Sequence, residues 1–428
     1  MGEKEPIESF DTNQLPSNNP MEDKRAEARC TLSGGLLFGV FDGHGGPRCA
    51  EIVSNRLLSY IAASLLPHST LNEYLASSDG KKGPMDFIEH YNENDYRISE
   101  REASVYAKSF KTYVVQLASR KQPFTSVEDA LKFSFLKLDN DLSREVLEEE
   151  DPVLKARALG AALSGSVGCV ALVDGADLHI AAVGDCGAVL GVTSGHKSWA
   201  AKSLTAQHTA QNGQEVMRVL REHPGEEKES LIRDGRLLGR LQPLRAFGDF
   251  RYDSSRIKVI TFHLLKWLTK VCLPPLKDAH TPPYLTARPD VTYHRLRPHD
   301  KFLVIASDGL WEMASPLEVV RLIGNHLSSR VFLGPFSVPH KNERVRRVES
   351  KVQRSRRGDV EVETTDVNSA THLIRTILGS GAGKGFTTVN LSLMLSLPQD
   401  IVRRFRDDIT ITVVFFNTSY LTKRSSSK

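Results

Sequence analysis

Apolar positions along this chain follow two patterns, short continuous runs and stripes at helical spacing. Continuous runs that are rich in β-branched and aromatic residues, and that end at turn residues, are typical of buried strands. They predict strands at residues 36–41, 167–173, 178–183, 188–192, 302–306 and 409–416. Asp174 and Gly175 separate the second run from the third, which predicts a hairpin.

Helical spacing predicts helices at residues 47–66, 101–119, 207–222, 317–327 and 370–378. One more helix is predicted to start at Thr125, because Thr125 and Glu128 fit a capping box. Asp139 and Asp141 fall within this helix. Since the segment lacks the glycine of a calcium loop, we interpret it as a solvated helix face.

Segments without either pattern are expected to be irregular. They are residues 1–20, 67–100 and 328–365, the last of which is strongly basic. We interpret the basic insertion as a solvated loop, with a docking patch for an acidic partner as the alternative. A short helix could lie within 257–272. The glycine-rich stretch 379–385 does not have the spacing of a phosphate-binding loop, so we interpret it as a flexible loop.

Length and composition are those of an ordinary globular protein, with 428 residues, 40% of them hydrophobic and 25% charged. We expect one domain over residues 13–417, after a polar entry at 1–12 and before a polar tail at 418–428. The net charge of +4 is too small to indicate nucleic-acid binding, and the longest apolar runs are too short to cross a bilayer. Five scattered cysteines without a CxxC pair favour a reducing compartment and argue against a disulfide framework or a zinc site.

Acidic residues stand where several predicted strands begin or end. Asp42 follows the strand at 36–41, Asp308 follows the strand at 302–306, and Asp407 precedes the strand at 409–416. One Asp-Gly after a strand is usually only a turn, but the repetition suggests that these carboxylates converge on a metal ion. Oxygen ligands without cysteine favour Mg²⁺ or Mn²⁺, and two such ions can activate a water and clamp a phosphoryl oxygen.

The order and spacing of seven motifs resemble those of the metal-dependent protein phosphatase 2C family. They are Glu22-Asp23, FDGHGG at 41–46, SGS at 164–166, VGD at 183–185, RAFGD at 245–249, SDGLWE at 307–312 and RDDIT at 406–410. The resemblance covers roughly residues 13–417. It implies an α+β fold, a central β-sandwich of two antiparallel sheets flanked by helices, with metal ions at one end.

The resemblance also implies a role for each acidic residue. Asp42 is expected to bridge two Mg²⁺ or Mn²⁺ ions. The further ligands that it implies are Asp308 and Asp407 for one ion, Glu22 and the Gly43 carbonyl for the other, and Asp185 for a weaker third ion. Asp23 is expected to hold these ligands in position without binding an ion itself.

Two further positions concern the substrate. The resemblance implies that His44 is a general acid toward the leaving serine oxygen, although a histidine in a turn is more commonly solvated or hydrogen-bonded. Asn18 stands where many relatives place an arginine that grips the phosphate, so Asn18 is the implied substrate-binding residue. The usual Asp-Ser-Arg after the glycine reads Asp185-Cys186-Gly187, which removes another guanidinium.

Residues 281–312, 370–378 and 394–401 resemble the pyruvate dehydrogenase phosphatase branch of the family. That branch implies a serine phosphatase acting on the phosphorylated alpha subunit of pyruvate dehydrogenase in the mitochondrial matrix. It also implies partners, the lipoyl domain of dihydrolipoyl acetyltransferase and a regulatory subunit. The acidic amino terminus offers no import helix, so we expect a longer precursor. The alternatives are a phosphatase of another phosphoprotein and a non-catalytic binding protein on the same fold.

Overall fold

In the computed structural model, the continuous apolar runs become the inner strands of two sheets. The structure describes residues 5–77, 87–91, 98–194, 198–253, 256, 260, 280–333, 366–380 and 388–425. One sheet has the order β1 (Ile7–Leu15), β14 (Ile409–Phe416), β13 (Asp300–Ala306), β7 (Gly187–Ser194) and β8 (Ser198–Ser203). The other has the order β12 (Asp290–Arg295), β6 (Asp177–Val183), β5 (Gly165–Asp174), β3 (Leu36–His44), β2 (Lys24–Cys30) and β4 (Ile88–His90), and β11 (Phe247–Gly248) also pairs with β5.

The neighbouring strands in both sheets are antiparallel. One hydrophobic cluster lies between the sheets and includes Phe38 of β3, Ile305 of β13 and Val414 of β14. The outer face of each sheet packs against helices through a second and a third cluster. Inner strands are therefore covered on both faces, which is why β3 and β14 read as continuous apolar runs.

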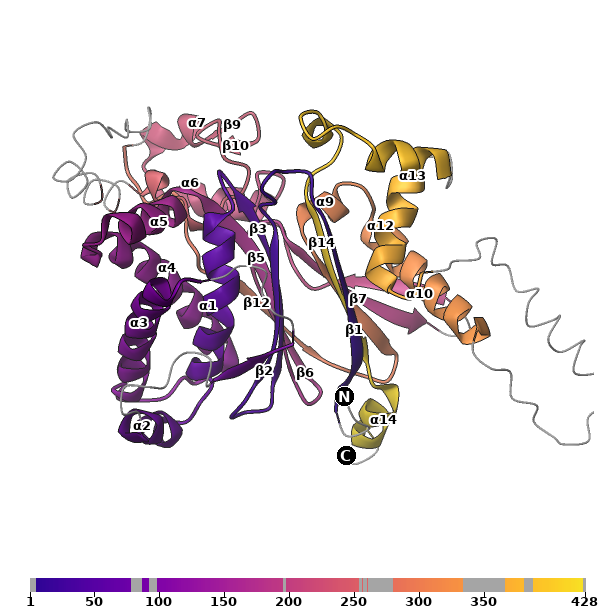
Figure 1. Ribbon diagram of the computed structural model, residues 1–428, viewed down its shortest axis with the longest axis horizontal. Helices are drawn as coiled ribbons and strands as arrows, with labels where there is room; N and C mark the ends of the chain where they lie inside the picture. The colour runs from indigo at the N-terminus through magenta and orange to yellow at the C-terminus, as the bar shows by residue number, and fades with distance from the viewer. Residues whose placement is uncertain are drawn as a thin grey trace, which may run out of the picture.

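Helices form an outer layer on each side of the two sheets (Figure 1). Those beside the larger sheet are α1 (Arg48–Ser64), α2 (His68–Ser77), α3 (Glu100–Ala118), α4 (Val127–Glu148) and α5 (Pro152–Leu163). Those beside the smaller sheet are α10 (Pro316–Leu333), α12 (Ser369–Ser380) and α13 (Thr388–Leu395), while α14 (Thr418–Ser425) ends the described chain. The predicted α+β sandwich of two antiparallel sheets flanked by helices is confirmed.

Short elements cluster beyond the ends of the strands, near the top of Figure 1. They are α6 (Gly213–Glu222), α7 (Lys228–Leu231), α9 (Asp308–Trp311), β9 (Ile232–Arg233), β10 (Arg236–Leu237), and the 3₁₀ turns η2 (Gly225–Glu227), η3 (Phe250–Tyr252) and η4 (Val402–Arg404). The helix expected at 207–222 starts only at Gly213, where the Asn212 side chain caps it. His208 and Thr209 are instead buried before it.

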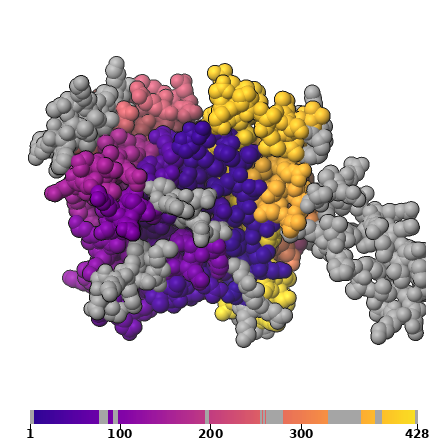
Figure 2. All heavy atoms as spheres, viewed as in Figure 1, coloured from indigo at the N-terminus to yellow at the C-terminus, as the bar shows by residue number. Residues whose placement is uncertain are grey.

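The amino-terminal segment is not the loose entry that its polarity predicted. Residues 7–15 form β1, which pairs with β14 along its length. Ile7 is fully buried, and the ring of Phe10 lies 5.3 Å from that of Phe38. In Figure 2 the indigo amino-terminal part lies between the purple helices and the orange and yellow carboxyl-terminal elements. An edge strand needs few apolar residues when its neighbour is already buried, so the pattern concealed it.

Other expectations from polarity also fail. Residues 67–100, expected to be irregular, contain α2 and β4, and residues 418–425 of the predicted polar tail form helix α14. The cap of α4 is Ser126, whose side chain accepts from the Asp129 amide, one residue later than predicted. Asp139 and Asp141 are buried rather than solvated: Gly248 N donates to Asp139, and the Tyr60 hydroxyl donates to Asp141.

Several predictions lie largely or wholly outside the described residues. The basic insertion is described only up to residue 333, the glycine-rich stretch only up to Ser380, and the segment 257–272 only at Ile260. No described helix is both long enough and apolar enough to span a membrane. The division into one domain at 13–417 stays a prediction.

Candidate metal centre

The ends of three strands bring the predicted acids to one end of the sandwich. Strands β13 and β14 are antiparallel neighbours, with Ala306 opposite Ile411, so Asp308 follows one strand where Asp407 precedes the other. Asp42 lies at the end of β3 in the facing sheet, opposite Val167 of β5. The sequence separates these residues widely, and the strand register brings them together.

Asp42 and Asp308 are the centre of this group. Burial raises the pKa of Asp42 well above its usual value, and the charges of Asp23, Asp308, Asp185 and Asp407 raise it further. Burial likewise raises the pKa of Asp308, with the charges of Asp185 and Asp407, to about 8, although a hydrogen bond with Asp42 opposes the rise. These carboxylates are therefore close enough to repel one another in the absence of a cation.

Asp23 lies behind them and is 1% exposed. Burial raises the pKa of Asp23, and hydrogen bonds with Ser307 and Thr410 lower it in part, so the pKa is about 7. Because Ser307 and Thr410 belong to the β13 end and to β14, Asp23 ties the amino-terminal segment to the smaller sheet. This position is consistent with the supporting role expected for Asp23.

Asp408 organises the segment that carries Glu22, a role that the sequence did not reveal. Its Oδ1 accepts from the backbone amides of Ser17 and Asn18 at 2.5 and 2.8 Å, and its Oδ2 accepts from the Glu22 amide at 2.8 Å. Asp408 is 2% exposed. The carboxylate thus binds three amides that no strand or helix would satisfy, and it fixes residues 17–22 at the site.

Glu22 reaches the end of β3 from this segment. Its Oε1 accepts from the Gly46 amide at 2.6 Å. Burial raises its pKa, the Gly46 hydrogen bond lowers it, and the neighbouring Asp408 charge raises it again. Gly43 permits the approach, since a Cβ there would stand 2.6 Å from the Glu22 carbonyl oxygen. Any larger residue at 43 would therefore push the backbone of Glu22 away from the end of β3.

Asp185 follows Gly184, which has a positive φ of 86°. Burial raises the pKa of Asp185, whereas its own amide and the Gln242 side chain lower it. The Gly184 amide donates to His208 Nδ1 at 3.0 Å, and His208 Nε2 lies 3.0 Å from Asp290 Oδ2. His208 is therefore the neutral ring with its proton on Nε2, and it anchors the turn that presents Asp185.

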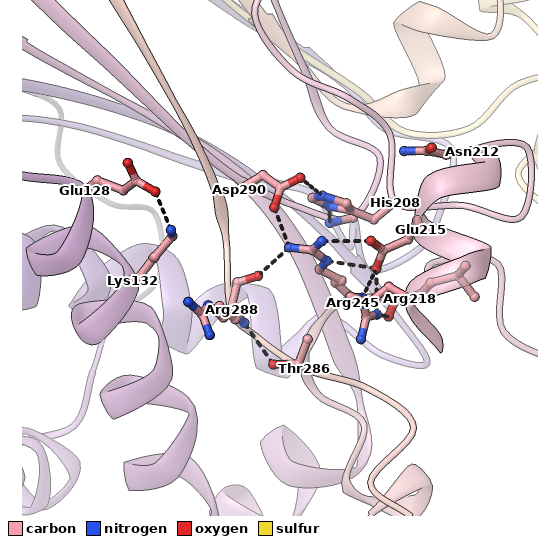
Figure 3. A network of polar contacts seen from close by, with 12 residues as sticks. Glu128, Lys132, His208, Asn212, Glu215, Arg218, Arg245, Thr286, Arg288 and Asp290 are labelled. Carbon is pink, nitrogen blue, oxygen red and sulfur yellow. Dashed lines mark hydrogen bonds and ion pairs between the residues drawn. The ribbon is translucent and has the colours of Figure 1, made fainter. Parts of the chain in front are cut away.

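An ion network, buried at Arg245 and Glu215 and exposed at Asp290, holds His208 in turn (Figure 3). Arg245 donates to both oxygens of Glu215, at 2.8 and 2.7 Å, and to Asp290 at 2.7 Å. Arg245 and Glu215 are 8% and 3% exposed. The network joins the loop before β11, helix α6 and the start of β12, so the Asp185 turn is fixed from three elements at once.

His44 has a partner that the sequence analysis missed. Its Nε2 lies 2.5 Å from Asp249 Oδ2, and Asp249 adopts a left-handed backbone with φ of 51°. Burial would lower the pKa of His44, but the charge and hydrogen bond of Asp249, with the charges of Asp185 and Glu22, raise it. Gly165 lies beneath the pair, where a Cβ would be 2.1 Å from His44 Nε2. RAFGD was recognised as a motif, but nothing in its pattern assigned Asp249 to His44.

Asp407 and Asn18 are both engaged within the protein. Asp407 Oδ2 forms an ion pair with Arg403 Nη1 at 2.5 Å. The side-chain amide of Asn18 (Nδ2) donates to Asp408 Oδ2 at 3.1 Å and to Asp407 Oδ1 at 3.4 Å. Asn18 therefore uses its amide to order the acidic segment. Substrate binding by Asn18 stays a prediction.

The described residues fit a cation in charge and in ligand type. Asp308 Oδ1 and Asp23 Oδ2 are buried and have no hydrogen-bond partner there. The group is made of carboxylates, the ligands that Mg²⁺ and Mn²⁺ prefer. In the described part of the chain, however, no three His, Cys, Asp or Glu side chains are already in an arrangement that could hold a metal ion. Ion binding would therefore require these side chains to turn toward one another.

Comparisons with known proteins agree with these motifs. A model of the family described as protein phosphatase 2C matches residues 73–333. The Rattus norvegicus protein named pyruvate dehydrogenase (acetyl-transferring) phosphatase 1, mitochondrial, is 42% identical over 423 residues, which cover 96% of this chain and 78% of that protein. The Homo sapiens phosphatase 2 of the same description is 40% identical, with the same coverage of both chains.

A more distant relative and a solved structure were also found. The Saccharomyces cerevisiae pyruvate dehydrogenase (acetyl-transferring) phosphatase 1, mitochondrial, is 31% identical over 443 residues, covering 96% of this chain and 69% of that protein. The crystal structure of a serine-threonine phosphatase 2C from Toxoplasma gondii aligns with 96% of this chain and 97% of its own, at a TM-score of 0.48 and 16% identity.

Proposed function

This chain belongs to the protein phosphatase 2C family, and from that membership we propose that it is a metal-dependent protein serine/threonine phosphatase of the pyruvate dehydrogenase alpha subunit. Removing phosphate from the serines of that subunit would reactivate the dehydrogenase complex. The substrate is taken from the names of relatives that share 40–42% of their aligned residues with this chain.

The observation that best supports the reaction is the meeting of Asp42 with Asp308, Asp185 and Asp407, each within electrostatic range of Asp42. Phosphate monoesters are among the slowest esters to hydrolyse unaided, so their hydrolysis requires strong stabilisation of negative charge. Carboxylates alone would repel the phosphate. A group of acids at this place is useful to a phosphatase only as a holder of cations.

We propose that two Mg²⁺ or Mn²⁺ ions bind here, with Asp185 contributing to a third. The proposed ligands are Asp42 for both ions, Asp308 and Asp407 for one, and Glu22 and the Gly43 carbonyl for the other. Bound there, such ions lower the pKa of an attacking water and neutralise the phosphoryl oxygens. The chain itself keeps the ligands in place through Asp23, Asp408 and the His208 network.

His44 is the proposed general acid. The Asp249 charge raises the pKa of His44 and so favours the protonated ring, in which both nitrogens are donors. Since Nε2 is bonded to Asp249, the proton given to the leaving serine oxygen would come from Nδ1. Asp249 both orients the ring and stabilises its positive form.

The compartment and partners follow the same relatives. Their names place them in mitochondria, and we assign this chain to the mitochondrial matrix. There we propose that it docks on the lipoyl domain of dihydrolipoyl acetyltransferase and pairs with a regulatory subunit. If an isolated lipoyl domain did not retain this chain in a pull-down assay, the first of these proposed partners would be contradicted.

Release of phosphate from the phosphorylated alpha subunit by the purified chain tests the proposal. With Mn²⁺ or Mg²⁺ present, the wild-type chain should release phosphate, and chelation should stop it. Asp308→Asn should abolish release, because it removes a charge next to Asp42. Asp234→Asn is the matched control, since Asp234 is exposed in the turn between β9 and β10 and should leave the rate unchanged.

The same assay separates the alternatives. Faster release from other phosphopeptides than from the dehydrogenase would indicate a different phosphoprotein substrate. A wild-type chain that is inert with both metals, yet binds a partner, would indicate a non-catalytic protein.

A further inference from the structure

The substrate phosphate must approach a group of carboxylates. A basic side chain beside that group that still has unused hydrogen-bond donors could therefore bind the phosphate. Among the described residues, several basic side chains near the acids already have partners. Arg406 Nη1 donates to the Pro16 carbonyl and to Ser17 Oγ, each at 2.9 Å or less. Lys24 Nζ donates to the carbonyls of Met21 and Asp23. Each of these cations is occupied in holding the loop before β2.

Arg403 differs from them. It lies in the 3₁₀ turn η4, four residues before Asp407, and its side chain is 53% exposed. Its Nη1 pairs with Asp407 Oδ2 at 2.5 Å, and the structure gives the guanidinium no other partner among the described residues. A guanidinium carries five N–H donors in a planar fork, so one ion pair leaves donors that face solvent.

Arg403 also lies close to more than one acid. It pairs with Asp407, which the Asn18 side chain links to Asp408. The Asp408 carboxylate accepts from the Glu22 amide. Asp407 and Glu22 are the proposed ligands of different ions. Arg403 therefore lies at the edge of the region that a phosphate would enter, and some of its guanidinium N–H donors make no hydrogen bond to the described residues.

We propose that Arg403 binds the phosphate group of the substrate, through the guanidinium donors that Asp407 does not occupy. This inference rests on the proposed function, and it names a phosphate-binding residue of the same site. The predicted substrate contact of Asn18 is a separate one, and its side-chain amide donates to Asp407 and Asp408. Arginine suits it, since a planar fork can bind two phosphate oxygens at once.

The competing explanation is that Arg403 only neutralises Asp407. In that case removing Arg403 would alter metal binding and leave phosphate binding unchanged. Calorimetric titration of the Mn²⁺-loaded protein with inorganic phosphate distinguishes the two, because it reads anion binding without turnover. A parallel titration with Mn²⁺ reads the metal site.

We expect Arg403→Ala to weaken phosphate binding by about 10- to 100-fold, the range for losing a hydrogen bond to a charged group. Mn²⁺ affinity should not fall, because the variant removes a competing cation from the proposed ligand Asp407. The Michaelis constant for the phosphorylated substrate should rise by a similar factor as phosphate affinity falls. Arg403→Lys should be intermediate, because it keeps the charge and loses the fork.

Arg404→Ala is the matched control, since Arg404 is an exposed arginine in the same 3₁₀ turn. It should bind phosphate as tightly as wild type. Phosphate affinity of Arg403→Ala within twofold of wild type would overturn the proposal, and so would a loss of Mn²⁺ affinity that accounts for the whole effect. A wild-type chain without turnover would contradict the proposed function, while the phosphate titration would still decide the role of Arg403.

Discussion

At the residue scale, His44 and Asp249 form a pair that would hold a proton beside the proposed metal centre. The pair is close, its carboxylate is 7% exposed, and Gly165 leaves it the space it needs. A buried ion pair of this kind costs desolvation, so a chain that needed only stability would gain little from it.

The first prediction concerns this pair. His44→Gln should lower kcat on the phosphorylated dehydrogenase by about 10²- to 10⁴-fold, the usual contribution of a general acid. The loss should be much smaller for p-nitrophenyl phosphate, because nitrophenolate leaves without needing a proton. Steady-state rates on both substrates, at saturating Mn²⁺, measure the difference.

Gly165→Ala is the companion variant, because its Cβ would displace His44 and Asp249 without removing either side chain. It should show the same selective loss and an unchanged Mn²⁺ affinity. Equal losses on both substrates, for either variant, would show that His44 is not the acid.

At the element scale, β1 shows how a polar segment becomes part of the core. Asp11 Oδ2 accepts from the Ser369 amide at the start of α12, and Ile7 lies opposite Phe416 of β14. The strand thus connects the carboxyl-terminal sheet strand to a helix of the outer layer. Its loss would expose the edge of β14 as well as remove these contacts.

The second prediction is that strand β1, Ile7–Leu15, is required for stability. Ile7→Ala should lower the free energy of unfolding by about 2–5 kcal/mol, the usual cost of truncating a buried isoleucine. Glu8→Ala, an exposed position on the same strand, should change it little. Urea unfolding of both variants measures this, and an unaffected Ile7→Ala would support the loose entry that the sequence suggested.

The third prediction concerns Glu227, which links η2 to the segment at 280–284. Burial would raise its pKa, but hydrogen bonds from Thr281, Tyr284 and the His280 amide lower it to about 2. A carboxyl whose pKa is depressed on folding contributes stability above its unfolded pKa of about 4.5, and loses it as the pH falls toward 2. The melting temperature should therefore fall between about pH 5 and pH 2.

Glu227→Gln removes this titration, so its melting temperature should fall less steeply over the same pH range. Thermal melts in the presence of a chelator measure both proteins without interference from the metal centre. Parallel curves for the two proteins would show that Glu227 does not contribute.

At the scale of the whole molecule, the site depends on elements drawn from both ends of the chain. Strand β1 pairs with β14, and Asp408 binds the amides of residues 17–22. Neither half of the chain could build the site alone. This is why acids at positions as distant as Glu22 and Asp407 lie in one region.

The sequence predicted the inner strands and long helices because each has a buried face that repeats at a fixed period, as in β14 and in the Leu131 to Leu142 stripe of α4. It also predicted which acids stand at strand ends. It could not reveal β1, the Asp408 contacts or the His44–Asp249 pair. These depend on partners that are hundreds of residues away, and on single hydrogen bonds that leave no periodic trace.

The fourth prediction follows from mutual repulsion among these acids. Mn²⁺ or Mg²⁺ should raise the melting temperature, because ions that bind only the folded chain stabilise it by about 2.7 kcal/mol at a hundredfold excess over their dissociation constant. Asp308→Asn should melt higher than wild type in a chelator, since it relieves repulsion with Asp42, and it should gain little from Mn²⁺. Equal gains for both proteins would place the ions elsewhere.

Anomalous X-ray scattering from crystals grown with Mn²⁺ locates the proposed ions. We expect two strong Mn²⁺ peaks that share Asp42, one beside Asp308 and Asp407 and the other beside Glu22 and the Gly43 carbonyl. Crystals that contain Mn²⁺ in solution but show no anomalous peak at Asp42 would contradict this expectation.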